Sequence, residues 1–237
     1  MGVFSDDQEK YRDLLCNALQ LFYKNDADAL FKENDGKNVN ECAMSGCVYR
    51  YMWCLMQQED GFPVADIDIE YDRMVKNPQE YYEKELSCAC KSKDGDKQCY
   101  AKCCQIIINK IETSLAKEGK KKNSDIIRKA VRPDIIVHNR NGEGIENNGL
   151  VVEFKKYDNN NVAFDMAKLY YFTCPESKSL QYQLGAMVRL FPKYAYVAFI
   201  CAQKILYGCK VWADSVEEVE CENIEEYLFE SVGCMAE

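Results

Sequence analysis

Apolar residues recur every three or four positions in several stretches of the chain, and this spacing predicts amphipathic helices. In the first such stretch the apolar face carries Leu14, Leu15, Ala18, Leu19 and Phe22. The stretches are separated by Gly, Pro, Asn and Asp, which end helices and favour turns. Helices are predicted over residues 6–24, 39–58, 77–86, 98–115, 162–172, 177–190 and 217–230.

Other stretches carry β-branched and aromatic residues in alternation or in short runs, which predicts strands. Ile67 and Ile69, for example, alternate with acidic residues, as expected for a half-buried strand. Strands are predicted over residues 65–71, 135–137, 150–156, 194–201 and 204–212. Strands and helices that are mixed along one chain predict an α/β fold, with a mixed central β-sheet flanked by helices.

The second and third predicted strands form a hairpin that brings charged residues together. Its loop is rich in Asn and Gly, and a symmetric loop places Val137 opposite Leu150 and hence Asp134 opposite Glu153. Facing residues have Cβ atoms roughly 4.5–5.5 Å apart, and alternation puts Lys155 on the face of Glu153. Two carboxylates this close repel each other unless a cation lies between them. The pattern indicates a functional site; the alternative is a surface hairpin with solvated charges.

These residues resemble the signature of the PD-(D/E)xK nuclease superfamily, chiefly its bacterial members, through Pro133-Asp134 and Glu153-Phe154-Lys155. The resemblance implies a restriction-endonuclease-like αβββαβ core and a metal-dependent hydrolase of phosphodiester bonds in nucleic acid, with DNA expected over RNA. It implies that Asp134, Glu153 and the main-chain carbonyl of Phe154 bind Mg²⁺ or Mn²⁺. Lys155 would then orient the attacking water or stabilise the charge that develops on the phosphate.

Further positions match the family less directly. Glu41, in the first turn of the second predicted helix, matches a Glu that often supplies another catalytic metal ligand; a favourable interaction with the helix dipole is the alternative. Lys168, Gln181 and Tyr182 match helices that line the site and bind substrate in the family, with ordinary helix surface as the alternative. His138, the one histidine of the chain, shares the face of the hairpin aspartate and is expected to contact substrate at most.

Composition bounds these expectations. A chain of 237 residues, 47% of them hydrophobic, suits a single domain with a substantial core. We expect residues 1–38 to form an N-terminal helical addition and residues 87–122 a Cys- and Lys-rich insertion. The net charge of −9 argues against a protein that coats polyanions generally, but not against local binding of nucleic acid. A polar N-terminus and the lack of an apolar run of roughly 20 residues lead us to expect a cytoplasmic protein without membrane contact.

The chain has 14 cysteines, which we expect to be mostly free thiols in a reducing compartment. Several cluster within the insertion, and four thiolates can hold Zn²⁺ tetrahedrally. Their C-x-C and C-x3-C spacings depart from the C-x2-C pairs of zinc ribbons, so free thiols are the alternative. The candidate zinc ligands are Cys88, Cys90, Cys99 and Cys103.

Residues 117–132 form the basic part of the chain, with seven basic and two acidic residues. This segment leads into the hairpin, so it is expected to hold backbone phosphates; a solvated linker is the alternative. Three functions stay open: a metal-dependent nuclease, a catalytically inactive nuclease-like fold that serves as a protein-interaction or regulatory module, and a cysteine-metal binding module. The complete Asp, Glu and Lys set favours the first. The expected phosphate contacts are Lys120, Lys121, Lys122 and Arg132.

If Lys120, Lys121 and Lys122 hold phosphates, changing all three to Ala should weaken binding of nucleic acid equally for all sequences. Each lost contact flattens the log–log salt dependence of binding by roughly 0.7–0.9, so the slope should fall by about two to three units. Turnover at saturating substrate should stay close to that of the wild type. Binding isotherms at several salt concentrations test this, and unchanged affinity and slope would identify a solvated linker.

Overall fold

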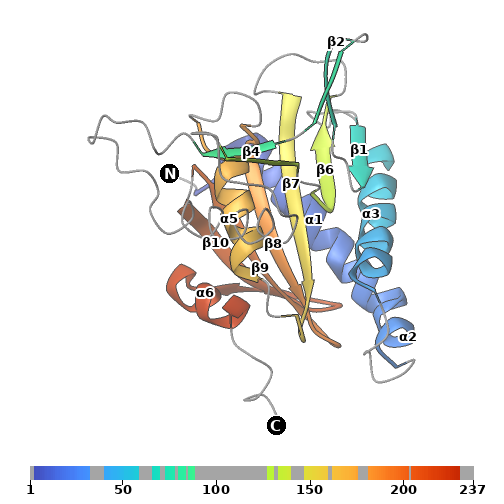
Figure 1. Cartoon of the computed structure of the whole chain (residues 1–237). Helices are drawn as coiled ribbons and strands as arrows, with labels where there is room; N and C mark the ends of the chain where they lie inside the picture. Colours follow the sequence, from blue (N-terminus) through green and yellow to red (C-terminus); the bar gives the residue numbers. More distant parts are fainter. Residues whose placement is uncertain are drawn as a thin grey trace, which may run out of the picture.

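A seven-stranded mixed β-sheet with helices on both faces forms the centre of the molecule, so the chain has the predicted α/β architecture (Figure 1). None of the helices in the described parts of the chain is both long and apolar enough to cross a membrane. This computed structural model describes residues 3–32, 40–58, 66–69, 73–77, 80–83, 85–88, 127–130, 133–139, 147–159, 162–175, 181–202 and 204–229.

The strand order of this sheet is β1-β6-β7-β8-β9-β10-β11. Only β7 and β8 pair in parallel, and the helix between them makes the crossover that a parallel pair requires. All the other neighbours in the sheet are antiparallel. The strands are β1 (Asp66–Ile69), β6 (Ile135–His138), β7 (Asn148–Lys156), β8 (Leu184–Leu190), β9 (Ala195–Cys201), β10 (Lys204–Val211) and β11 (Val216–Val219).

The predicted central hairpin is present as β6 and β7. Val137 pairs with Leu150, as the symmetric loop predicts, and the same register continues to Ile135 opposite Val152. A bulge shifts the register at His138, at the far end of β6. The hairpin β9–β10 is also present as predicted.

Alternation along the hairpin strands divides the core into two layers. Ile135 and Val137 pack with helices on one face, whereas Ile136 and Val151 pack with helices on the other. Figure 1 shows the two sets of helices on opposite sides of the strands. The first face is covered by α1 (Asp6–Asn25), α2 (Ala27–Lys32) and α3 (Glu41–Gln58); the second is covered by α5 (Val162–Phe172) and α6 (Cys221–Phe229).

Arg189, which lies on β8 and is 1% exposed, ties the terminal helix to the hairpin. Its guanidinium group donates to the carbonyls of Leu228 at 2.6 Å and Tyr227 at 3.3 Å, in the last turn of α6. It also donates at 2.7 Å to the carbonyl of Tyr157, the residue after β7. A buried cation is thus held by main-chain oxygens from two distant segments, including carbonyls that a helix end leaves unpaired.

The prediction of a helix over residues 77–86 is wrong. The chain there forms strands, and antiparallel pairing joins β2 to β3 and β4 to β5. A proline suited to the first turn of a helix favours a helix locally. The two adjacent tyrosines favour a strand when a partner strand is available. The strands are β2 (Arg73–Asn77), β3 (Glu80–Glu83), β4 (Glu85–Cys88) and β5 (Ile127–Ala130).

Two later helix predictions are also corrected. Residues 184–190 form β8 and not a helix; all seven are buried, and periodicity alone cannot distinguish a buried strand from a buried helix. Residues 216–219 form β11, which pairs with β10, so the terminal helix begins only at Cys221. The helix predicted over 98–115 and residues 89–122 of the insertion lie outside the described residues.

Gly149 lies on β7 where α1 approaches the sheet. A Cβ added there would lie 2.3 Å from Cζ and Oη of Tyr11, whose side chain is completely buried. Gly149→Ala should therefore force α1 away from β7 and lower the free energy of unfolding by roughly 1–3 kcal/mol, the usual cost of overpacking. Urea denaturation measures this change.

Gly46→Ala in α3 is the matched control. The nearest atom to its added Cβ is Cδ1 of Ile69 at 3.9 Å, an ordinary contact. In a helix this change should be neutral or stabilise by up to about 1 kcal/mol. Equal stability of Gly149→Ala and wild type would contradict the close packing of α1 on β7.

Candidate active site

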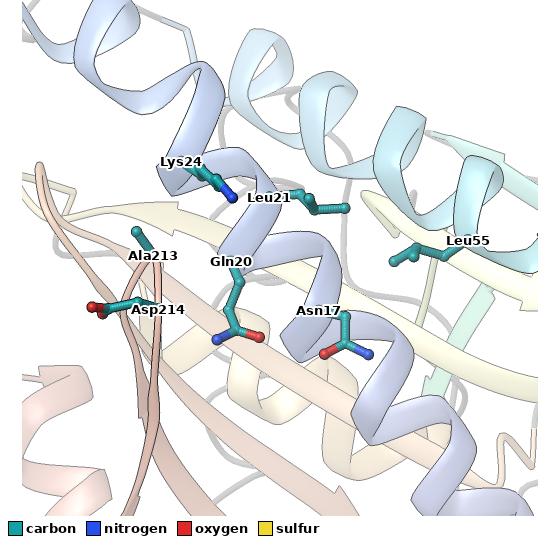
Figure 2. Close-up of a pocket in the computed structure, with 7 residues that line it drawn as sticks. All are labelled: Asn17, Gln20, Leu21, Lys24, Leu55, Ala213 and Asp214. Atoms are coloured by element: carbon teal, nitrogen blue, oxygen red, sulfur yellow. The ribbon is translucent and has the colours of Figure 1, made fainter.

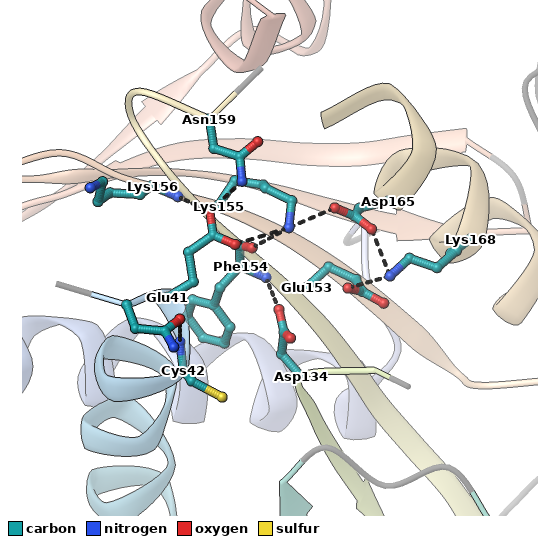
Figure 3. Close-up of polar contacts among 11 residues, drawn as sticks. Glu41, Cys42, Asp134, Glu153, Phe154, Lys155, Lys156, Asn159, Asp165 and Lys168 are labelled. Atoms are coloured by element: carbon teal, nitrogen blue, oxygen red, sulfur yellow. Dashed lines mark hydrogen bonds and ion pairs between the residues drawn. The ribbon is translucent and has the colours of Figure 1, made fainter. Parts of the chain in front are cut away.

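The hairpin places the predicted acids beside each other. Asp134 lies immediately before β6, and continuing the observed register by one pair puts it opposite Glu153. The main-chain N–H of Phe154 donates to Oδ2 of Asp134 at 2.7 Å, which fixes this carboxylate at the end of the strand pair. Figure 3 shows both carboxylates with Lys155 at the same end of the hairpin.

Lys155 reaches three different elements. Its Nζ lies 2.9 Å from Oδ2 of Asp165 on α5 and 3.2 Å from Oε2 of Glu41 on α3. It also donates to the carbonyl of Phe154 at 3.1 Å. Because these partners come from both sides of the strand, the ammonium group lies where the two helix layers meet the end of β7 (Figure 3).

Glu41 begins α3, where a carboxylate is favoured by the helix dipole. Its Oε1 accepts from the main-chain N–H of Lys156 at 3.1 Å and from Nδ2 of Asn159 at 2.7 Å, while Oε2 faces Lys155. The helix start is thereby bonded to the end of β7. Glu41 thus occupies the first turn of its helix and also belongs to the cluster, while its role as a metal ligand stays a prediction.

The helix α5 contributes an acid and a base one turn apart. Lys168 Nζ lies 2.7 Å from Oε2 of Glu153 and 2.6 Å from Oδ1 of Asp165. Residues three apart in a helix lie on the same face, and this face is directed at β7. Asp165 is 3% exposed and thus bridges two lysines inside the protein.

Burial dominates the electrostatics of the hairpin acids. Glu153 is 1% exposed, and its Oε1 has no hydrogen-bond partner among the described residues. Burial raises the pKa of Glu153 well above its usual value; Lys168 opposes this shift, whereas Asp165 and Asp134 add to it. Burial also raises the pKa of Asp134, although the Phe154 N–H and the two lysines oppose the shift.

The lysines experience the opposite balance. Burial lowers the pKa of Lys155, but the nearby carboxylates of Asp165, Glu41 and Asp134 together raise it by more than burial lowers it. The net shift of the Lys155 pKa is therefore upward. For Lys168, burial likewise lowers the pKa, while Glu153 and Asp165 raise it to a net upward shift. Both lysines are therefore ammonium groups at neutral pH.

The excess charge of the cluster bears on metal binding. With all groups ionised, four carboxylates face two ammonium groups, so two negative charges remain. Their oxygens are the donors that Mg²⁺ and Mn²⁺ prefer, and the bare Oε1 of Glu153 suits such an ion. No three His, Cys, Asp or Glu side chains within the described ranges are grouped as ready metal ligands. Lysine ammonium groups lie between the carboxylates: the acids are Glu41, Asp134, Glu153 and Asp165, and the bases are Lys155 and Lys168.

Three residues predicted to bind substrate lie away from this cluster. His138 is buried at the other end of β6 and its Nε2 lies 2.7 Å from Oδ2 of Asp68 on β1. Gln181 is in a turn with a φ of 38° and donates to the carbonyl of Pro175 at 2.6 Å. Tyr182 is 2% exposed and packs in the core under α5. Of the predicted substrate contacts whose side chains the structure describes, only Lys168 joins the cluster.

The remaining predicted residues fall outside the side chains that the structure describes. These include the basic residues proposed to hold phosphates and the thiols proposed to hold zinc. Their functions stay predictions: Lys120, Lys121, Lys122, Arg132, Cys88, Cys90, Cys99 and Cys103.

Asp165 is the site residue that sequence reasoning missed. The family resemblance matches Asp165 and Lys168 together on one helix, but only Lys168 is predicted to contact substrate. The signal available was the three-residue spacing of an acid and a base on a helix that follows the hairpin directly.

A separate hollow of about 390 Å³ lies on the α1 face (Figure 2). It is lined by α1 residues, by Leu55 of α3, and by Ala213 and Asp214 in the turn after β10. None of its lining residues belongs to the charged cluster, so the cluster remains the candidate site. Comparison of the chain with models of protein families, with curated proteins and with solved structures finds no match.

The raised pKa of Asp134 gives a prediction about stability. A carboxyl group whose pKa is raised by folding stabilises the fold fully below its unfolded pKa of about 3.9 and loses this contribution as the pH rises through the raised value. Asp134→Asn keeps an acceptor for the Phe154 N–H but cannot ionise. In the presence of EDTA it should therefore unfold at a higher temperature than wild type at pH 8, and the difference should vanish near pH 3.5.

Asp158→Asn provides the control for this measurement. Asp158 is 39% exposed and pairs with Lys156 at 3.0 Å. The Lys156 side chain is only 8% exposed, but the Asp158 carboxylate keeps its contact with solvent. Asp158→Asn therefore removes no buried carboxylate and should not raise the unfolding temperature at pH 8. An Asp134→Asn protein less stable than wild type at pH 8 would show that the lysines outweigh the cost of burying the carboxylate.

Proposed function

We propose that this protein is a metal-dependent nuclease of the PD-(D/E)xK type that hydrolyses phosphodiester bonds of nucleic acid, DNA more readily than RNA. The observation that carries the proposal is Glu153: a buried carboxylate beside Asp134, with one bare oxygen and with Lys155 two positions along the strand. Buried acids with shifted pKa values and a neighbouring lysine are typical of active sites.

The order of elements supports a restriction-endonuclease-like core. A helix α3, the strands β1, β6 and β7, the helix α5 and the strand β8 follow one another in the αβββαβ order of a restriction-endonuclease-like core, interrupted by β2–β5. The four strands are adjacent in the sheet, with two antiparallel pairs followed by the parallel pair. In this arrangement the hairpin lies at the centre of the core.

Four residues of the cluster have a chemical task under this proposal. Asp134, Glu153 and the carbonyl of Phe154 would hold Mg²⁺ or Mn²⁺. When bound, the ion supplies Lewis acidity and a lowered pKa for coordinated water. Lys155 carries a fixed positive charge at the end of β7 and would stabilise the charge that develops on the phosphate. Glu41 orients Lys155 and fastens α3 to the end of β7.

A second candidate is a catalytically inactive fold that serves as an interaction module. The ion pairs favour it, since Lys168 and Lys155 already compensate Glu153 and Asp165 without any metal. The two functions differ in one respect that can be measured. An interaction module has no need for Mn²⁺ binding that depends on Asp134.

Cleavage of DNA and RNA in Mg²⁺, Mn²⁺ or EDTA tests the proposed function. The wild type should cut with either metal and not in EDTA. Lys155→Ala should lower kcat by about 10²–10³, the usual effect of removing one group that stabilises charge in the transition state. Binding of nucleic acid should be retained, because Lys155 faces the reacting group and not the length of the strand.

Lys156→Ala is the matched control, because Lys156 is adjacent in sequence but alternates to the other face and pairs with Asp158. Its kcat should stay within a few-fold of wild type. Calorimetric titration of Asp134→Ala with Mn²⁺ completes the test. Wild-type protein that neither cuts nor binds Mn²⁺ would exclude the nuclease and leave the interaction module.

A further inference from the structure

The charged groups of the cluster form a single row in which the signs alternate. From α3 to the hairpin it runs Glu41, Lys155, Asp165, Lys168, Glu153, with successive separations of 3.2, 2.9, 2.6 and 2.7 Å. Asp165 occupies the centre of the row. Each of its two oxygens serves a different lysine, Oδ2 for Lys155 and Oδ1 for Lys168.

Two lysines held this closely would repel each other without an anion between them. Asp165 meets this need because it faces both lysines, whereas Glu41 faces Lys155 and Glu153 faces Lys168. It is almost fully buried, whereas the side chain of Glu41 is 27% exposed and its attraction to Lys155 is weakened by solvent. Its short side chain stands on the helix of the β7-α5-β8 crossover, so its position is set by the packing of the sheet itself.

We propose that Asp165 is a positioning residue, which holds Lys155 and Lys168 at fixed places on either side of the hairpin acids. The inference rests on the proposed nuclease function, because it assigns Lys155 to the reacting phosphate. Lys168, held against Glu153 by the same carboxylate, keeps a second positive charge at the site. Without Asp165, Lys155 would retain only Glu41 and the Phe154 carbonyl among the partners described above.

A double-mutant cycle measures the positioning without reference to activity. Asp165→Asn, Lys155→Met and the double variant are compared in EDTA by their thermal unfolding midpoints. If Asp165 holds Lys155, the double variant should lose clearly less than the sum of the two single losses. The matched control is the ion pair of Asp158 and Lys156 on the same segment, where the partly exposed carboxylate should make Asp158→Asn and Lys156→Met much closer to additive.

Steady-state kinetics then tests the consequence, well below the unfolding midpoints. Asp165→Asn should lower kcat by about tenfold or more, the scale of one lost orienting contact, and leave KM close to wild type. Asp165→Glu restores the charge and should recover part of kcat. A change that merely loosened the fold would not give this split or this rescue.

The outcomes separate the two claims. A wild-type protein without nuclease activity overturns the proposed function and, with it, this assignment. An active wild type with additive unfolding shifts for Asp165 and Lys155 overturns the positioning role alone. An active wild type with a non-additive cycle but unchanged kcat in Asp165→Asn also overturns it, since Lys155 would then be held without consequence for the reaction.

Discussion

A carboxylate in the middle of an apolar sheet is the constraint on which the rest of the site depends. Glu153 lies on β7 between buried residues. An ionised group there is costly unless a group of opposite charge lies beside it. Lys168 supplies that charge, Asp165 is needed to accommodate Lys168 and Lys155 together, and Glu41 completes the row. The cluster therefore follows from placing one acid on β7.

The sheet topology determines which elements can place charged groups beside Glu153. Because β7 and β8 run parallel, the chain must cross over between them, and α5 lies on the face to which Glu153 points. The antiparallel β6 brings Asp134 to the same end from the other side. α3 reaches that end from the opposite layer through Glu41. Three separate parts of the fold thus meet at the end of one strand.

Much of the hairpin could be predicted from sequence because its signals are local. The symmetric loop fixed Val137 opposite Leu150, and this register in turn placed Asp134 by Glu153. β8 could not be predicted in the same way, because its residues are all buried and carry no period. Its place is set by pairing with β7, which local patterns do not encode.

Side-chain contacts between distant segments also could not be predicted from the sequence. Parity placed His138 on the correct face, but its bond to Asp68 depends on β1 lying beside β6. Asp165 could be assigned to a helix, yet its role depends on which face of that helix meets β7. Such contacts are properties of the assembled sheet and not of any one segment.

The buried guanidinium of Arg189 has a consequence for how the protein is made. Its main-chain acceptors include Tyr227 and Leu228, which follow it by 38 and 39 residues, while its strand lies beside β7, which carries Glu153 and Lys155. During synthesis, β6, β7, α5 and β8 emerge from the ribosome well before these carbonyls exist. Until the carbonyls of Tyr227 and Leu228 have been synthesised, burial of the Arg189 guanidinium in the nascent sheet would leave some of its N–H groups without hydrogen-bond acceptors. Completion of the sheet around the charged cluster is thereby tied to a segment translated later, so a chain released before α6 would keep the residues of the cluster without the contacts that hold β8 to that helix.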